Sequence, residues 1–264
     1  MRAVLGALAA LLVLTPAAAE ARPLRVLSLD QCADQYVLAL APEAELALSS
    51  RADDPDSWMR DAARGRPRVR PTLEAAIGFQ PDVVVRYWGG EPRLLAALEK
   101  RGTRVLVIND ATDMEGVREN LRSASQGLGQ EARGTALIVH MDRRLAQAAG
   151  GGRRREAVYV TPGGYTTGSG SLIDSILKAA GFRNGVTGPG YQPLGIEKIA
   201  LSPPALFVRG FFQQWRADWR GPGRHPVVQR AAKGRTVADL PAATLSCPAW
   251  FAADAAALLA EGAR

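Results

Sequence analysis

The sequence predicts an α/β protein built from two related lobes in tandem, with a ligand cleft between them. Residues 73–86 and 196–209 carry an apolar residue, Glu, Pro and Arg at the same offsets, and each stretch is typical of a short helix, a turn and a buried strand. A second repeat lies upstream, where the strand-like runs 25–29 and 157–160 each lead into a loop and an apolar helix. Repetition of both the residues and the element order indicates two copies of one unit. The matched pairs are Glu74 and Glu197, Pro81 and Pro204, and Arg86 and Arg209.

The first 19 residues are typical of a signal peptide. Arg2 precedes an apolar stretch over residues 3–14, and the small residues 17–19 suit signal peptidase. The alternative is a transmembrane anchor, but a span needs about 20 apolar residues and this run is shorter. No cysteine follows the expected cleavage point, which disfavours a lipid anchor. We therefore expect cleavage near Ala19 and export of a soluble protein.

The rest of the chain divides into three parts. A chain of 264 residues can bury one large core or two small ones. Between residues 113 and 148 apolar residues recur at spacings of three and four, as in helices with one buried face, and Gly127 and Gly129 are expected to bend or break this stretch. The alternative is an ordinary surface helix within a single domain. We predict an N-terminal lobe over 20–112, a linking helix over 113–150 and a C-terminal lobe over 151–264.

The chain is basic, with 33 Lys and Arg against 26 Asp and Glu and a formal net charge of +7. Removal of a signal peptide that contains Arg2 lowers this charge to +6. The densest basic run, residues 153–155, follows three glycines, which is typical of a linker. We therefore expect no nucleic-acid partner. The basic excess instead gives a mild preference for anionic ligands or membrane surfaces.

Side chains suited to ligand binding gather in the loops that follow the predicted strands. Ligands of open α/β sheets bind beyond the carboxyl ends of the strands. These loops are rich in aromatic residues and Arg, although only 6% of the chain is aromatic, and such a lining suits a large, flat, partly polar ligand. The alternative is that the aromatic side chains only pack between the lobes. The candidate ligand-binding residues are Gln31, Cys32, Arg86, Tyr87, Trp88, Tyr165, Thr166, Thr167, Arg209 and Phe211.

Catalytic motifs are weak in this sequence. The glycine-rich segment 163–170 lacks the Lys of a nucleotide-hydrolysing loop, because Gly170 stands in that place, although anion contact at the following helix N-terminus is plausible. The segment also lacks the Gly-x-Ser-x-Gly motif of serine hydrolases. His140 and His225 are the only histidines, and no His-Glu-x-x-His pair is present to hold zinc. We therefore predict no catalytic residue, no metal site and no cofactor.

The two cysteines, Cys32 and Cys247, allow three interpretations. An exported protein with one pair most often forms a disulfide, which here would connect the lobes across the cleft and would require Cα atoms closer than about 7 Å. A thiol at a helix N-terminus tends to ionise and could contact a metal-bearing ligand. The third possibility is two free thiols. The sequence leaves all three open, and Cys247 joins Cys32 as a candidate cleft residue.

The ordered motifs resemble one family, the periplasmic binding proteins of ABC importers for cobalamin and ferric siderophores. The resemblance covers nearly all of the chain after residue 19 and implies two Rossmann-like lobes joined by a long backbone α-helix, a periplasmic location and a monomer. It also implies binding without chemistry, followed by delivery to an ABC permease and its ATPase. The motifs that carry it are RVLSLDQCADQYVLAL, PTLEAAIGFQPDVVV, RYWGG, LEKRGTRVLVIND, YTTGSGSLIDSILKAAGFRN and YQPLGIEKIA.

The resemblance also implies roles for particular residues. One Glu on each lobe of the family binds Arg residues of the permease, and the matching positions are Glu74 and Glu197. Segments 87–90 and 165–168 are similar to those of cobalamin binders, whereas Arg86, Arg209 and Tyr191 would suit an anionic ferric siderophore. A haem binder is a further alternative. A hypothesis of a different class is an exported enzyme with its substrate in the cleft, which predicts turnover of that substrate. A third hypothesis is a receptor that signals to a membrane sensor.

Overall fold

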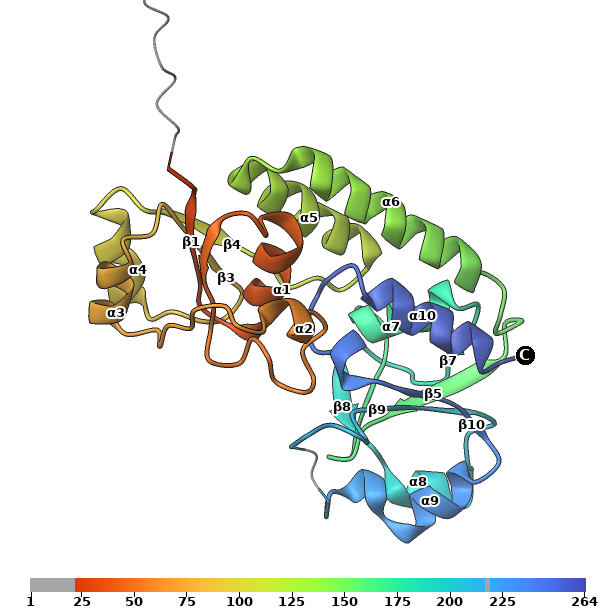
Figure 1. Cartoon of the computed structure of the whole chain (residues 1–264). Helices are drawn as coiled ribbons and strands as arrows, with labels where there is room; N and C mark the ends of the chain where they lie inside the picture. Colours follow the sequence, from red (N-terminus) through yellow and green to blue (C-terminus); the bar gives the residue numbers. More distant parts are fainter. Residues whose placement is uncertain (1–21, 217–218) are drawn as a thin grey trace, which may run out of the picture.

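The computed structural model describes residues 22–216 and 219–264, and the predicted signal peptide lies outside them. The fold class predicted from the sequence is confirmed, since two α/β lobes lie side by side and a long helix runs along both of them (Figure 1). Within the described residues, no helix has the length and apolar character needed to cross a membrane.

The N-terminal lobe is built on a parallel four-stranded sheet in the order β2-β1-β3-β4. Alternating side chains of the strands enter two separate cores. Leu27 and Val84 pack under helices α3 and α4, whereas Val26 and Val85 pack under α1 and α5. The strands are β1 (Arg25–Ser28), β2 (Glu45–Ala47), β3 (Val83–Arg86) and β4 (Arg104–Val107), and the helices are α1 (Gln31–Leu40), α2 (Arg60–Ala63), α3 (Leu73–Phe79), α4 (Pro92–Glu99) and α5 (Met114–Leu128).

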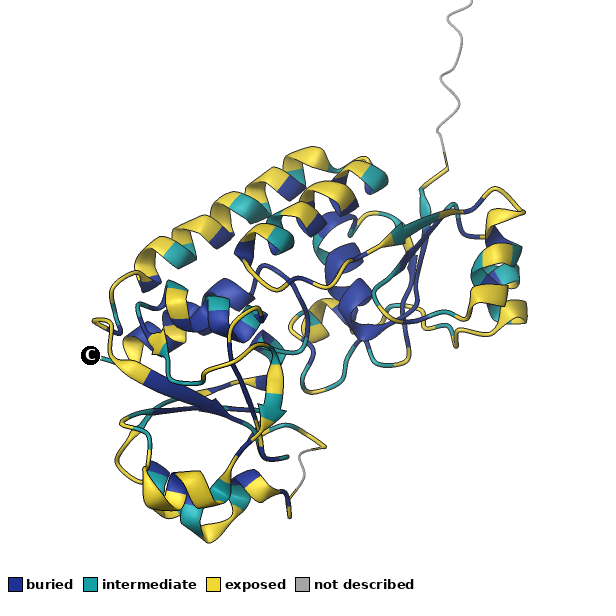
Figure 2. Ribbon diagram, turned by 180° about the vertical axis from the view of Figure 1, so that it is seen from behind, coloured by how far each residue is buried: buried dark blue, intermediate teal, exposed yellow. Residues whose placement is uncertain are grey.

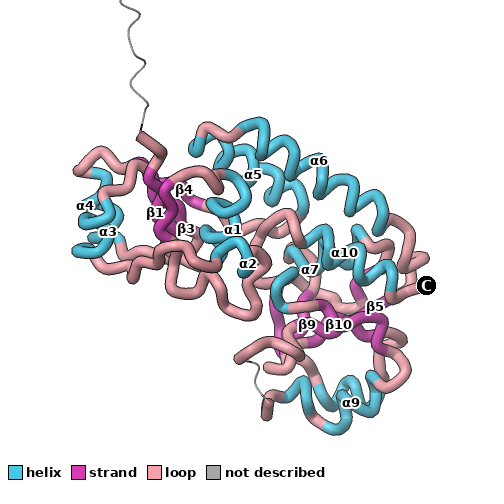
Figure 3. The backbone as a smooth tube through the Cα atoms, in the orientation of Figure 1, coloured by secondary structure: helices cyan, strands magenta, loops and turns pink. Residues whose placement is uncertain are grey.

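The C-terminal lobe repeats this plan with a parallel sheet in the order β10-β9-β5-β7 and a separate antiparallel two-stranded sheet of β6 and β8. Figure 3 shows α9 on one side of the sheet and α7 and α10 on the other. The strands are β5 (Glu156–Val160), β6 (Tyr165–Thr167), β7 (Arg183–Asn184), β8 (Tyr191–Pro193), β9 (Phe207–Gly210) and β10 (Thr236–Leu240), and the helices are α7 (Leu172–Ala179), α8 (Ile196–Leu201), α9 (Pro226–Ala232) and α10 (Ala252–Glu261), with short 3₁₀ turns at Pro222–Arg224 and Ala242–Thr244.

The two sheets have the same topology, which is the structural form of the sequence repeat. The strands of each sheet can be numbered by their order within the lobe, with the separate β6–β8 sheet left out. Both sheets then have the spatial strand order 2-1-3-4. Helix α3 leads into β3 just as α8 leads into β9, so the repeated segments 73–86 and 196–209 occupy equivalent places. The carboxyl ends of β1 and β5, and of β3 and β9, are therefore equivalent sites.

The stretch predicted as one linking helix, residues 113–150, forms two helices. Gly129 ends α5 in the left-handed conformation, with φ of +67°, as its glycine predicts, whereas Gly127 lies inside α5. Helix α5 packs on the N-terminal lobe, so α6 (Glu131–Ala148) alone bridges the lobes, against α5 and α10. Figure 2 shows both helices exposed on their outer faces and buried toward the lobes.

The C-terminal segment crosses back into the core of the N-terminal lobe. Trp250 and Phe251 pack in the same buried cluster as Tyr36 of α1. The hydroxyl of Tyr36 donates a 2.6 Å hydrogen bond to the carbonyl oxygen of Pro248, and its ring meets that of Trp250 edge to face at 5.8 Å. Trp58 stacks on Phe251 with ring centroids 5.2 Å apart. The two lobes therefore share buried contacts in addition to the bridge of α6.

Candidate ligand-binding cleft

A cavity of about 360 Å³ lies between the lobes, where the carboxyl ends of their strands face each other. Both lobes contribute to its lining. The N-terminal lobe supplies Tyr87 and residues 110–112, which follow β3 and β4. The C-terminal lobe supplies residues 170–172, Gly190, Tyr191 and residues 245–248. The lining contains no Lys or Arg.

The ionisable groups of this cavity are two tyrosines and one carboxylate, beside the hydroxyl groups of Thr112, Ser171 and Ser246. The hydroxyl of Tyr87 donates to Oδ1 of Asp110 at 3.0 Å. Partial burial, followed by the bond to Asp110, raises the pKa of Tyr87 to about 12. The pKa of Tyr191, on the opposite lobe, is raised by desolvation and then by the charge of Asp110. The cavity therefore presents neutral phenols beside a negative charge, and it favours neutral or cationic ligand groups.

Asp30 holds the N-terminal wall of the cleft together. Its Oδ1 accepts from the backbone N–H groups of residues 32 and 33 at 3.1 and 3.0 Å, which caps α1. Its Oδ2 accepts from the N–H groups of residues 87, 88 and 89 at 2.7, 3.2 and 2.9 Å. Gly89 allows this approach, because a Cβ there would lie 2.5 Å from the carbonyl oxygen of Leu29. One buried carboxylate thus fixes the loop that carries Tyr87.

Sequence reasoning did not select Asp30 or Asp110 as site residues. Asp30 has a recognisable signal, since an Asp between a predicted strand and an apolar helix is a typical N-cap. Its second role needs the carboxyl ends of β1 and β3 to be neighbours, which is a tertiary property. Asp110 follows the predicted strand in RVLVIND, and the rule that ligands bind beyond strand ends would have included it.

Of the predicted ligand-binding residues, Tyr87, Tyr191 and Cys247 line the interlobe cavity. Trp88 is 57% exposed on the same loop as Tyr87, and Tyr165 is 52% exposed on β6, beside β8. Neither belongs to the lining of the cavity. These exposed rings are available to a ligand larger than the cavity.

Several other predicted residues make bonds within the protein. The amide Nε2 of Gln31 donates to Ser57 at 2.8 Å, and Gln31 is buried. The Nε of Arg86 donates to the carbonyl oxygen of Gly89 at 2.6 Å. The hydroxyl of Thr167 lies 2.9 Å from that of Ser171, the N-cap of α7. These contacts give each side chain a structural role beside the cleft.

The remaining predicted residues of the C-terminal lobe point elsewhere. Arg209 forms a two-point ion pair with Asp239, with 2.5 and 2.8 Å contacts, and its guanidinium lies 4.8 Å from the ring centre of Phe212. Phe211 is half-buried with φ of +64°, a strained value for a bulky residue. Thr166 is buried on the side of the β6–β8 sheet away from the interlobe cavity.

Cys32 and Cys247 form a disulfide, so the first of the three interpretations holds. Their Cα atoms lie 5.4 Å apart, across 215 positions of sequence. Cys32 lies in the first turn of α1 of the N-terminal lobe, and Cys247 lines the cavity from the C-terminal segment. The disulfide connects the two walls of the cleft at its base and leaves no free thiol among the described residues.

The two glutamates of the sequence repeat occupy matching places. Glu74 lies in the first turn of α3 and Glu197 in the first turn of α8, and both are exposed. Helices α3 and α8 are outer helices of the two lobes (Figure 1). Neither carboxylate forms an ion pair within residues 22–216 and 219–264. Among those residues there is also no cluster of three or more His, Cys, Asp or Glu that could hold a metal ion.

Comparison with known proteins identified two sequence relatives of this chain. No protein-family model matches the chain. Two curated relatives, both named cobalamin-binding protein and both from strains of Halobacterium salinarum, are 25% identical over 202 residues. The match covers 72% of this chain and 55% of each relative, so the chain spans about half the length of the curated relatives it matches.

Solved structures with the same fold are periplasmic binding proteins. The haem-binding protein HutB of Vibrio cholerae has a TM-score of 0.71 at 17% identity, over 88% of this chain and 96% of its own. The haem-binding protein BhuT, solved with two haems, has a TM-score of 0.68 at 21% identity, over 91% and 99%. The vitamin B12-binding protein BtuF of Vibrio cholerae has a TM-score of 0.63 at 17% identity, over 91% and 96%. The chain therefore has the two-lobe fold of these substrate-binding proteins.

Proposed function

We propose that this chain is the periplasmic substrate-binding protein of an ABC importer and that it captures a metal-chelate nutrient, a corrinoid such as cobalamin, between its lobes. The observation that carries the proposal is the interlobe cavity, which has a tyrosine from each lobe and the carboxylate of Asp110 but no basic side chain in its lining. The name of the curated relatives supports the same ligand class. The protein would bind and release its ligand without chemical change and deliver it to an inner-membrane permease and its ATPase.

The charge of the cavity distinguishes among metal chelates. A corrin is a large, flat macrocycle with neutral amide side arms, which accept and donate hydrogen bonds to phenols and backbone groups. Haem carries carboxylates and many ferric siderophore complexes are anionic, so both would meet the charge of Asp110 without an opposing Arg or Lys in the lining. Haem or a ferric siderophore is the second candidate, supported by the haem-binding proteins that share the fold and by Arg86 at the end of β3.

Equilibrium titration tests the ligand class. The protein contains five Trp residues, so ligand binding can be followed by quenching of intrinsic fluorescence. We expect saturable quenching by cyanocobalamin and weaker or no saturation by haemin, a ferric hydroxamate and a ferric catecholate. Saturation by haemin or an iron chelate alone would replace the nutrient and retain the binding role. Chemical conversion of a bound compound would favour the enzyme alternative.

Two variants of the C-terminal wall locate the ligand. Tyr191→Ala should weaken cyanocobalamin binding by about 2 kcal/mol, the loss typical of an aromatic anchor. Tyr191→Phe should retain most of the affinity if the ring provides contact area, and should lose it if the hydroxyl provides a hydrogen bond. Equal affinity of the wild type and the Ala variant would place the ligand outside this cavity.

We further propose that Glu74 and Glu197 bind the permease. Their matched positions on α3 and α8 and the lack of an internal ion partner among the described residues support this role. The double variant Glu74→Ala and Glu197→Ala should retain ligand affinity and lose transport, because charge pairs at interfaces can couple by several kcal/mol. The control is Glu99→Ala with Glu261→Ala, which removes two other exposed carboxylates. Normal uptake in the first variant would disprove the docking role.

A further inference from the structure

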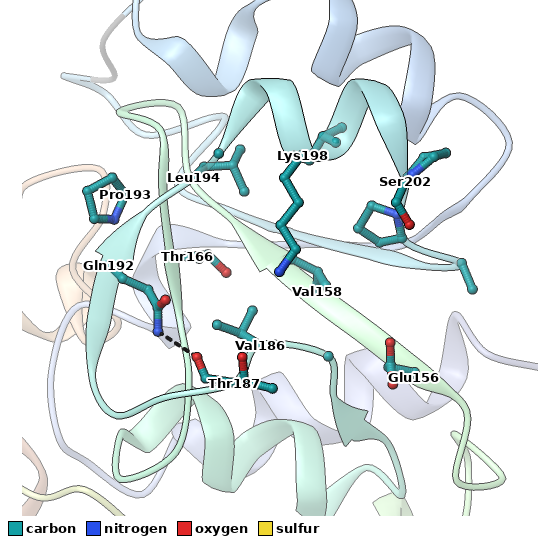
Figure 4. A pocket seen from close by; sticks show the side chains of 16 residues that line it. Glu156, Val158, Thr166, Val186, Thr187, Gln192, Pro193, Leu194, Lys198 and Ser202 are labelled. Carbon is teal, nitrogen blue, oxygen red and sulfur yellow. Dashed lines mark hydrogen bonds between the residues drawn. The ribbon is translucent and has the colours of Figure 1, made fainter.

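A second cavity, of about 380 Å³, lies inside the C-terminal lobe. It is bounded by β5, the β6–β8 sheet, the segment 185–187 and α8 (Figure 4). The β6–β8 sheet separates it from the interlobe cavity, because Tyr191 lines the interlobe cavity whereas the next residue, Gln192, lines this one. The two cavities are therefore distinct and share one wall.

The wall of this cavity contains an unsatisfied polar group. Thr166 is only 5% exposed, and its hydroxyl has no hydrogen-bond partner within the described part of the chain. The Thr166 side chain lies on the cavity side of β6 in Figure 4. Buried hydroxyls in native proteins are almost always paired with protein, water or ligand. A hydrogen-bonding group that occupies the cavity would provide the missing partner.

One cationic group extends into the same space. Figure 4 shows the Lys198 side chain descending from α8 with its Nζ toward the middle of the cavity. Lys198 forms no ion pair with any residue that the structure describes. The one carboxylate of the lining, Glu156, is paired with Arg183 at 3.6 Å. The cation of Lys198 is therefore available to an anionic group.

The rest of the lining combines apolar side chains with the polar side chains of Thr187, Gln192 and Ser202. A ligand that places an anion at Lys198 would bury an apolar body against the aliphatic and proline side chains of this lining. The amide Nε2 of Gln192 is already bonded to the carbonyl oxygen of Thr187 at 3.3 Å. The apolar lining residues are Val158, Val186, Pro193, Leu194, Ile199, Pro203, Pro204 and Ala205.

We propose that this cavity is an accessory binding site for a small amphipathic organic anion, such as a medium-chain carboxylate. The carboxylate pairs with Lys198 and accepts from Thr166, and the aliphatic chain lies along Val158, Val186 and Leu194. This site does not depend on the proposed function of the interlobe cleft, because its lining does not overlap that of the interlobe cavity.

Methyl NMR of the whole protein titrated with octanoate tests the proposal. Octanoate should bind with a Kd of about 1 mM, a typical affinity for a ligand of its size. Its binding should shift the methyl signals of Val158, Val186 and Leu194. Lys198→Gln should weaken binding about tenfold, the effect of losing one charged hydrogen bond. Thr166→Val keeps the size of the side chain and should weaken binding about threefold. Octanol, which has the same chain without the charge, should bind more weakly than octanoate.

Lys233→Gln is the matched control, because Lys233 is an exposed lysine at the end of α9, outside this cavity. It should bind octanoate like the wild type. Loss of binding in Lys198→Gln but not in Lys233→Gln would support the site. Two outcomes would overturn it. One is no shift at the three methyl groups up to about 10 mM octanoate, and the other is equal binding by all variants.

Discussion

The two lobes share one strand order but organise the loops at their strand ends differently. In the N-terminal lobe, the chain passes from β1 into α1 through Asp30, whose carboxylate accepts from two backbone N–H groups at the start of α1 and three in the loop after β3. In the C-terminal lobe, β6 follows β5 and pairs with β8 in a separate two-stranded sheet, and Ser171 caps α7 alone. One wall of the cleft is thus fixed by a single buried carboxylate, and the other contains an added two-stranded sheet.

The repeated arginines show the same divergence. Arg86 and Arg209 lie near the carboxyl ends of equivalent strands, and each is paired in register with one residue of the edge strand beside it. That residue is Val107 for Arg86 and Asp239 for Arg209. The guanidinium of Arg209 is therefore paired within its sheet, whereas the side chain of Arg86 bonds only to the carbonyl oxygen of Gly89 among the described residues. A residue repeated in sequence has kept its place and changed its partner.

The lobes are also unequal in their cores, because the C-terminal segment contributes to the N-terminal one. Removing the disulfide tests how much that contribution depends on the covalent link. Cys32→Ala with Cys247→Ala should lower the free energy of unfolding by about 4 kcal/mol, since the bond closes a very long loop of the unfolded chain. Urea denaturation of the double variant and of the reduced wild type measures the change. Equal stability would mean that Tyr36, Trp250 and Phe251 hold the segment unaided.

The contrast between the two helix caps gives the next largest effect. Asp30→Ala should destabilise the protein by about 3–4 kcal/mol, because it removes a buried acceptor of five N–H groups. Ser171→Ala, the matched change in the C-terminal lobe, should cost about 1 kcal/mol, the usual value of one cap. Thermal and urea unfolding compare the two variants. Similar losses would mean that the loop of residues 87–89 does not depend on Asp30.

The general architecture could be predicted from the sequence because it depends on local patterns. The repeat of Glu, Pro and Arg at fixed offsets located α3, β3, α8 and β9, and the glycine at 129 located the break before the linking helix. These signals lie within short windows, where apolar spacing and turn residues determine the element. The equivalence of the two lobes followed from their order.

The site was harder to predict, because its contacts join residues far apart in sequence. Arg209 and Asp239 are 30 positions apart, and Asp30 and the loop of residues 87–89 are 57 to 59 apart. Strand register, which no local pattern specifies, brings them together. The sequence likewise left the state of Cys32 and Cys247 open, since a disulfide requires two distant Cα atoms to approach. The sequence shows that Trp88 follows a predicted strand, but it does not show that Trp88 lies outside the lining of the cavity.

A buried carboxylate in the first helix of each lobe provides a pH test of the comparison. Asp34 of α1 accepts from the N–H and hydroxyl of Ser49 at 2.9 and 2.6 Å, whereas Asp174 of α7 pairs with Lys178 at 2.6 Å. Burial raises the pKa of Asp34 from 3.8 to about 6. The folded protein therefore holds this proton more tightly than the unfolded chain, so the stabilisation is full below pH 3.8 and is lost as the pH rises through about 6.

The contribution of Asp34 to the pH dependence should be roughly 2–3 kcal/mol between pH 4 and 6.5, taken at about 1.4 kcal/mol per pKa unit. Asp34→Asn should remove this decrease in the free energy of unfolding, because the amide oxygen can still accept from Ser49 and the amide group does not titrate. Urea denaturation at a series of pH values measures it. An unchanged pH profile in the variant would assign the fall to other groups.

The smallest effect separates the two repeated arginines. Arg209→Met should lower the free energy of unfolding by about 1 kcal/mol, because a half-exposed two-point ion pair with Asp239 is lost. Arg86→Met loses one hydrogen bond to Gly89 and should cost no more than about 0.5 kcal/mol. In a double-mutant cycle, Asp239→Asn should couple to Arg209→Met and not to Arg86→Met. Coupling of Asp239 to both arginines would show that the charge of Asp239 acts across the cleft, and the distinction between a neutralised and an available arginine would then fail.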